Sequence, residues 1–149
     1  MGSMERRIKL TIGSSLENVP LLTGVINGLC SFIPLSDIES YQVEVCIVEA
    51  VNNAIKHAYD NKPGYDVEVV FTLHTDRLVL EICDYGRAME QMVKSSLDFD
   101  QNDVKNLPEG GMGLFIIEAV MDDVSYRSYD GRNTLTMTKL FKTKKRGDL

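Results

Sequence analysis

The alternation of apolar and polar residues predicts a strand followed by a helix at the start of the chain. Apolar side chains occupy every second position near the end of residues 6–12, which is the period of a strand with one buried face. Beyond the break at residues 13–15, apolar positions recur every three or four residues up to about Ile33, which predicts a helix. Ser15 is its candidate N-cap, and Pro20 fits because proline is tolerated in a first helical turn.

A second and longer helical pattern begins at Ser36 or Asp37, each of which is a candidate cap, and ends near residues 60–64. Two runs with strand periodicity follow at residues 66–74 and 77–83. The two residues between these runs are too few for anything but a tight turn. The pair is therefore predicted to form an antiparallel hairpin.

The rest of the chain contains a long segment without periodicity and then three short elements. Residues 85–109 are rich in Asp, Asn, Ser and Lys, and a loop of this length is uncommon unless it is a lid or a binding loop. A short apolar helix is predicted over residues 114–121. A second hairpin is predicted from residues 124–129 and 133–141, turned at residues 130–131.

This order of elements predicts a two-layer α/β sandwich. We expect a mixed, mainly antiparallel sheet of about five strands, with about three helices on one face, because strands that alternate in polarity bury only one side. Residues 4–142 are predicted to form a single domain. Residues 1–3 resemble a remnant of an expression vector, and residues 143–149 are expected to be a basic tail, most simply a solvated one.

The second half of the longer helix, residues 49–59, places polar side chains inside an otherwise apolar pattern. Glu49, Asn53 and Lys56 project from one face, and Asn52 and His57 lie at its margins. Taken alone, this pattern favours an ordinary solvated face with a Glu and Asn pair one turn apart. The remaining segments of the chain must decide between the two interpretations.

Composition and charge narrow the class of protein. The chain has 149 residues, is 44% hydrophobic and carries a net charge of −6, which is typical of a globular protein with no general affinity for nucleic acid. No apolar stretch is long enough to span a membrane. Cys30, Cys46 and Cys83 lie in apolar contexts without metal-ligand spacing, so we expect free thiols and a cytoplasmic location.

Two further segments carry candidate chemistry. Residues 109–114 contain three glycines in four positions before a predicted helix. This pattern suits a phosphate bound by backbone N–H groups, and a flexible hinge is the alternative that the glycines alone favour. Asp84 ends a buried strand and is followed two residues later by Gly86. A buried carboxylate needs a donor, which an adenine amine could supply, although a turn that bonds its own backbone is the alternative.

The order of these segments resembles the Bergerat-fold ATP-binding family of gyrase, sensor histidine kinases and MutL. Within this family the chain is most similar to the anti-sigma-factor serine kinases of bacterial partner switching. The similarity rests on the Glu-Ala-Val-x-Asn-Ala-x-x-His-x-Tyr sequence of residues 49–59, on residues 110–117 and on residues 121–124.

The resemblance implies ATP and Mg²⁺ as ligands and a role for each matching residue. Glu49 would be the catalytic base, and Asn53 would hold Mg²⁺ between the phosphates. Asp84 would bind the adenine N6 amine, Gly86 would leave room for the ring, and His57 would be a secondary contact. The other implied nucleotide contacts are Gly110, Gly111, Met112, Gly113, Leu114 and Thr134.

Two positions depart from the family pattern. Ala88 stands where the family often has a second glycine after Asp84. The predicted lid contains Lys94 and Lys105 but no arginine after Arg87, so no cation is assigned to the transition state.

The resemblance also implies partners. An anti-anti-sigma protein of the STAS type would be the phosphorylated antagonist, and a sigma factor or an analogous regulator would be sequestered. A homodimer is expected from the same resemblance, whereas direct contact with nucleic acid or a membrane is not. The alternative is a nucleotide-responsive interaction module that transfers no phosphate.

Overall fold

A single antiparallel sheet forms one layer of the protein. The structure is a computed structural model that describes residues 5–89 and 111–142. Its strands lie in the order β1-β2-β3-β5-β4, and every neighbouring pair is antiparallel. The two-layer architecture is as predicted, but the sheet is wholly antiparallel among the described strands rather than mixed. The strands are β1 (Arg6–Gly13), β2 (Asp66–Leu73), β3 (Arg77–Asp84), β4 (Asp123–Tyr129) and β5 (Arg132–Leu140).

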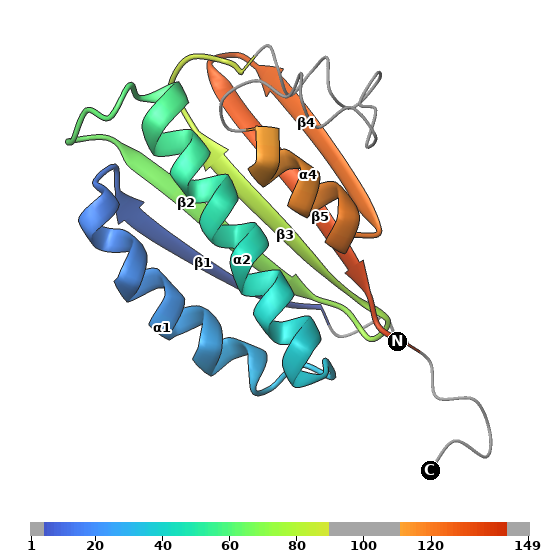
Figure 1. The fold of residues 1–149 in the computed structure, drawn as a ribbon. Coiled ribbons are helices and arrows are strands. Elements are labelled where there is room, and N and C mark those ends of the chain that lie inside the picture. Colours follow the sequence, from blue (N-terminus) through green and yellow to red (C-terminus); the bar gives the residue numbers. More distant parts are fainter. Residues whose placement is uncertain (1–4, 90–110, 143–149) are drawn as a thin grey trace, which may run out of the picture.

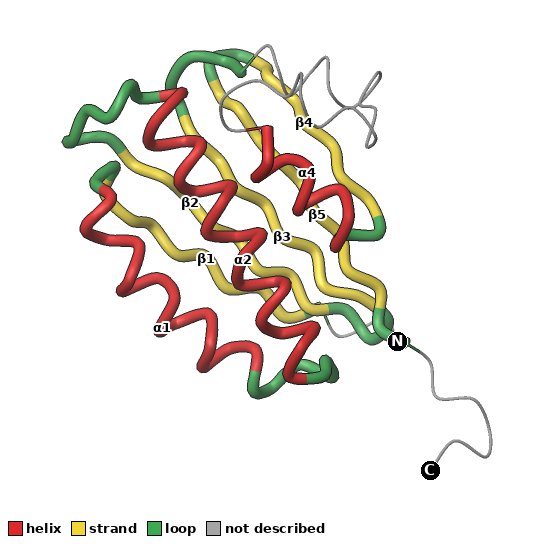
Figure 2. Tube along the Cα trace, viewed as in Figure 1, coloured by secondary structure: helices red, strands yellow, loops and turns green. Residues whose placement is uncertain are grey.

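Three helices of the described part of the chain cover one face of this sheet (Figure 1). They are α1 (Val19–Cys30), α2 (Asp37–Asn53) and α4 (Gly111–Val120), and α2 lies between the other two (Figure 2). A short 3-10 turn, η1 (Leu16–Asn18), leads into α1. α2 therefore contacts both α1 and α4.

One of the two predicted helix N-caps is present in the structure. The hydroxyl of Ser36 accepts a hydrogen bond from the Glu39 N–H, and the Glu39 carboxylate accepts one from the Ser36 N–H, each at 3.1 Å, so the predicted cap of α2 is confirmed as a capping box. The prediction that Ser15 caps α1 is wrong. Ser15 precedes η1 and makes no side-chain cap bond, and Asn18 occupies the N-cap position of α1.

The end of α2 departs from a regular helix. Residues Ala54–Ala58 form the π-helical segment η2, in which the Tyr59 N–H donates to the Ala54 carbonyl oxygen at 3.1 Å. Single turns of π-helix occur frequently at functional sites. The chain then turns through Asp60 and Asn61, both with positive φ, before it enters β2.

Residues on the two faces of the sheet have different partners. Leu80 and Ile82 of β3 and Leu135 and Met137 of β5 belong to the apolar core beneath the helices. Because side chains alternate along a strand, Cys83 and its neighbour on β5, Thr134, lie on the opposite face. This parity decides which side chains at the strand ends can reach the helices.

Several predictions fall outside the described residues. These are the remnant at residues 1–3, most of the predicted lid (residues 90–110) and the tail at residues 143–149. Within the described residues, no helix has the length and apolarity that a membrane crossing requires.

Candidate functional site

Asp84, at the end of β3, is a buried carboxylate with one oxygen occupied. Its Oδ1 accepts hydrogen bonds from the Gly86 N–H at 3.0 Å and from Asn133 Nδ2 at 2.7 Å. Among the described residues, no partner reaches Oδ2. Burial raises the pKa of the Asp84 carboxyl, against the lowering effect of these two bonds. Oδ2 is therefore an acceptor that no donor of the described residues satisfies.

The β5 side chain that reaches Asp84 is Asn133, whereas Thr134, the contact that the resemblance implied, lies on the other face of the sheet. Asn133 pairs directly with Asp84 in the sheet register and is 2% exposed. Thr134 pairs with Cys83, and its hydroxyl lies 3.7 Å from the Cys83 Sγ, on the face away from the helices. The two-residue period that places Leu135 inward also places Asn133 inward, so this signal was present in the sequence.

Asn53, at the end of α2, carries an amide nitrogen without a partner. The side chain is buried, and its Nδ2 has no hydrogen-bond partner in the described part of the structure. Asn53 and Asp84 line the same small cavity, of about 10 Å³, with Met89 and Tyr126 among its other walls. A cavity of this size holds about one water molecule. An unpaired buried amide costs about 1–3 kcal/mol, so a polar guest at this point would remove a penalty.

Glu49, one turn before Asn53 on α2, lies against the start of α4. A Cβ atom placed on Gly113 would lie 2.7 Å from the Glu49 Oε2 and 3.5 Å from the Glu49 Cβ. A larger residue at position 113 would therefore displace this carboxylate, whose free end is the nearest atom. The free N–H groups of a helix start also favour a nearby negative charge.

The predicted phosphate segment is only partly described. Gly111 begins α4, Gly113 lies in its first turn, and Leu114 is buried in the core. Gly110 and the side chain of Met112 lie outside the described residues.

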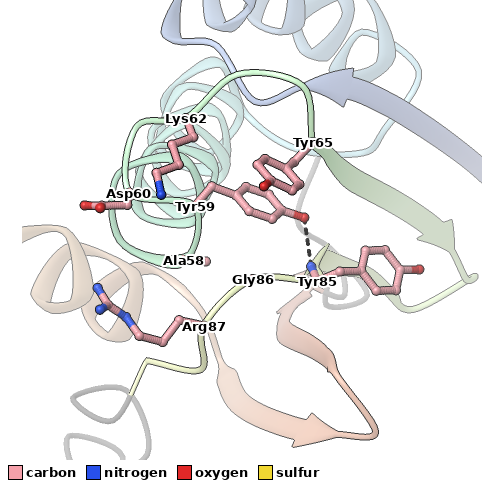
Figure 3. Close-up of a pocket in the computed structure, with 8 residues that line it drawn as sticks. All are labelled: Ala58, Tyr59, Asp60, Lys62, Tyr65, Tyr85, Gly86 and Arg87. Atoms are coloured by element: carbon pink, nitrogen blue, oxygen red, sulfur yellow. Dashed lines mark hydrogen bonds between the residues drawn. The ribbon is translucent and has the colours of Figure 1, made fainter.

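The loop after Asp84 is fastened to the end of α2 (Figure 3). The Tyr59 hydroxyl accepts a hydrogen bond from the Tyr85 N–H at 2.8 Å and donates one to the Asp66 carbonyl at 2.6 Å. A Cβ on Gly86 would lie 2.3 Å from the Ala58 carbonyl oxygen. The missing side chain of Gly86 thus makes room for the helix end, a role that the sequence had not indicated.

Two cationic side chains line a second cavity beside this loop. Figure 3 shows Lys62 and Arg87 around a cavity of about 350 Å³ that is also lined by the stacked rings of Tyr59 and Tyr65. Arg87 donates to the carbonyl oxygen of His57 at 3.3 Å. The side chain of His57 is half-buried, whereas Lys56 is exposed. The His57 carbonyl, and not its imidazole, makes this contact.

Two pairs of candidate residues are thus close to each other: Asn53 and Asp84 line one small cavity, and Glu49 lies against Gly113. Glu49 and Asn53 lie one turn apart on α2, which connects the two pairs. This arrangement is suited to a ligand with an amine-bearing ring and an anionic chain.

Comparison with known proteins identifies the family of this chain. Residues 12–139 match the family described as "Histidine kinase-like ATPase domain". The serine-protein kinase RsbW of Staphylococcus aureus strain RF122 is 33% identical over 147 residues, which cover 95% of this chain and 91% of the relative. The RsbW of strain MRSA252 has the same identity and coverage.

Two solved structures have the same fold at low sequence identity. The structure of the RsbU and RsbW domains of a Mycobacterium tuberculosis protein superposes with a TM-score of 0.65 and 16% identity, covering 93% of this chain and 33% of that one. The SiaB-SiaC complex of Pseudomonas aeruginosa superposes with a TM-score of 0.60 and 14% identity, covering 88% of this chain and 89% of that one. By its match over residues 12–139 and its RsbW relatives, the chain belongs to the histidine kinase-like ATPase family, in its branch of serine-protein kinases.

Proposed function

We propose that this chain is an ATP-dependent anti-sigma regulatory protein that phosphorylates a serine or threonine of an anti-anti-sigma antagonist of the STAS type. The named relatives are serine-protein kinases, and one solved neighbour is a complex between SiaB and SiaC. The chain would bind the unphosphorylated antagonist, and phosphorylation of the antagonist would release it from the chain. The freed chain would then sequester a sigma factor or an analogous regulator.

The observation that carries this proposal is the pairing of Glu49 with Asn53, one turn apart on α2, beside the bare backbone of Gly113. A protein that only binds nucleotide has use for the amide but not for a second carboxylate at the phosphate end. Glu49 would accept the proton of the attacking serine hydroxyl, which requires a base within hydrogen-bond reach of that oxygen. The N–H groups at the start of α4 would hold the transferred phosphate.

The residues present fit Mg-ATP. The unpaired Nδ2 of Asn53 is the test, because a buried N–H donor needs an acceptor and a phosphate oxygen of the nucleotide would supply one. The amide oxygen of Asn53 would contribute to Mg²⁺, which commonly takes one or two protein ligands and completes its shell with phosphates and water. When bound, this ion would neutralise charge on the phosphate oxygens.

The adenine end depends on Asp84. Its free Oδ2 would accept the N6 amine, while Oδ1 stays bonded to Gly86 and Asn133. The present cavity of about 10 Å³ is too small for a purine, so neighbouring side chains must move when nucleotide binds. Met89 and Tyr126 are placed to do so, since both line this cavity.

Partners beyond the antagonist belong to the same proposal. A homodimer and a cytoplasmic location would accompany the anti-sigma role, and the three cysteines, all free and buried, suit a reducing compartment.

Phosphoryl transfer from labelled ATP tests the proposal. The chain is incubated with Mg²⁺, ATP labelled in the γ-phosphate and purified STAS-domain proteins, and transfer to a serine or threonine is followed. Transfer to one of them supports the kinase. Nucleotide-dependent capture of a STAS protein without transfer would instead identify an interaction module.

A further inference from the structure

Asn133 makes two hydrogen bonds that together fix the loop of the candidate adenine site. Its Nδ2 donates to Asp84 Oδ1 at 2.7 Å and to the Gly86 carbonyl oxygen at 2.9 Å. A carboxylate oxygen and a backbone carbonyl are both acceptors only, so the amide nitrogen, and not the amide oxygen, must face them. Both N–H bonds of the amide are thereby used.

The effect on Asp84 is to leave only one oxygen for a ligand. Oδ1 receives two donors, one from Asn133 and one from the Gly86 N–H, while no described residue donates to Oδ2. Asn133 is 2% exposed and Asp84 is 6% exposed, so water cannot readily replace either bond. The orientation of the carboxylate is therefore set from one side by Asn133.

The same loop is held from its other side by the helix end. Tyr85 donates its N–H to the Tyr59 hydroxyl, and Gly86 packs against the Ala58 carbonyl. These contacts fix the backbone but do not touch the Asp84 carboxylate. Asn133 is thus the side chain that couples the backbone position to the direction of the free oxygen.

We propose that Asn133 is a positioning residue that sets base specificity, by directing Asp84 Oδ2 toward the exocyclic amine of an adenine nucleotide. This inference rests on the proposed function, since it assumes a nucleotide at Asp84. It goes further in assigning selection among purines to a β5 side chain that would not itself contact the base.

The test compares ATP with the triphosphate of purine riboside, which lacks the 6-amino group. A hydrogen bond to a charged acceptor is worth about 1.5–3 kcal/mol, so the wild-type chain should prefer ATP by about tenfold or more. In Asn133→Ala the preference should fall to less than about threefold, because the carboxylate is no longer directed. Affinities are measured by calorimetry with Mg²⁺ present.

Two further variants separate positioning from folding. Thr134→Ala changes the adjacent residue on the opposite face of β5 and should keep the wild-type preference. Asn133→Thr retains one hydroxyl donor and should give an intermediate preference, which also covers the case in which Asn133→Ala does not fold.

The pH profile of ATP binding gives an independent readout. Loss of the Asn133 donor raises the pKa of Asp84 further, so ATP affinity should begin to fall at a higher pH than in the wild type as the solution is acidified.

The outcomes are distinguishable. An unchanged preference in folded Asn133→Ala, or an equal loss in Thr134→Ala, overturns the role of Asn133. Wild-type chain that binds both triphosphates equally overturns the inference but leaves nucleotide binding in place. Wild-type chain that binds neither contradicts the proposed function itself.

Discussion

Gly113 passes so close to Glu49 that a Cβ atom at position 113 would lie 2.7 Å from the Glu49 Oε2. Gly113→Ala should therefore displace the carboxylate rather than merely stiffen α4. A misplacement of about 1 Å in a reacting group can cost about 100-fold in rate. We expect Gly113→Ala to lower kcat for transfer to a STAS protein by about this factor, measured under saturating Mg-ATP.

Gly28→Ala is the matched control for that variant. Gly28 lies within α1, and a Cβ there would meet nothing within 4 Å. The change should raise the free energy of unfolding by about 0.5–1 kcal/mol and leave kcat unchanged. Equal losses of kcat in both variants would contradict the account of Gly113.

Gly86→Ala should destabilise the fold itself. The added Cβ would lie 2.3 Å from the Ala58 carbonyl oxygen and 2.9 Å from the Tyr59 Cδ1, and backbone atoms cannot rotate away. Overpacking of this kind costs about 1–3 kcal/mol, to be measured by urea unfolding without nucleotide. Wild-type stability in this variant would show that the loop is free to move away from η2.

Asp84→Asn should stabilise the chain while it abolishes ATP binding. Burial raises the pKa of Asp84 above its value in the unfolded chain, so the ionised form is disfavoured in the folded state at neutral pH. Asparagine can keep its amide oxygen toward Gly86 and Asn133. Its amide NH2 group then faces the N6 amine of the base, and two donors cannot form a hydrogen bond.

The pH dependence gives this prediction its sign. Protonation of wild-type Asp84 removes the penalty of burying its charge. The contribution of this group to the wild-type free energy of unfolding is therefore largest at low pH and is lost as the pH rises through the raised pKa. The advantage of Asp84→Asn in urea unfolding should therefore be largest at neutral pH and should shrink on acidification. A constant difference at all pH values would contradict it.

Asn53→Ala should remove ligand binding without a matching loss of stability. Its Nδ2 makes no hydrogen bond in the described structure, so the free energy of unfolding should fall by no more than about 0.5 kcal/mol. Wild-type chain at about 100 times the dissociation constant of Mg-ATP should gain about 2.7 kcal/mol, and Asn53→Ala should gain none. Asn52→Ala, one residue away and half-buried, should keep the gain.

Hydrophobic periodicity was sufficient to predict the architecture. The turn at Asp130 and Gly131 illustrates why: both residues have positive φ, at 52° and 77°, a conformation that an Asp-Gly pair adopts readily. The capping box at Ser36 is equally local. The π-helical end of α2 was not predicted, because η2 keeps its apolar residues buried much as a regular helix would.

The candidate site was predictable where one element determines a residue's direction, and less so where two strands meet. Helical spacing alone places Glu49 and Asn53 on one face of α2, although their roles come from the family resemblance. Which of Asn133 and Thr134 lies beside Asp84 depends on the register of β5 against β3, and the family resemblance indicated Thr134, which pairs with Cys83. The packing role of Gly86 depends on the position of η2, which lies about thirty residues away in sequence and leaves no local pattern.

The central claim is that Glu49 acts in phosphoryl transfer and not in nucleotide binding. Glu49→Gln keeps the size of the side chain and removes the base. A STAS-domain protein that the wild-type chain phosphorylates serves as the substrate. It is incubated with Mg-ATP and either the wild-type chain or Glu49→Gln, and its intact mass is then measured. We predict one added phosphoryl group with the wild-type chain and none with Glu49→Gln, which should still show the stabilisation by Mg-ATP. Undiminished phosphorylation by Glu49→Gln would contradict the account.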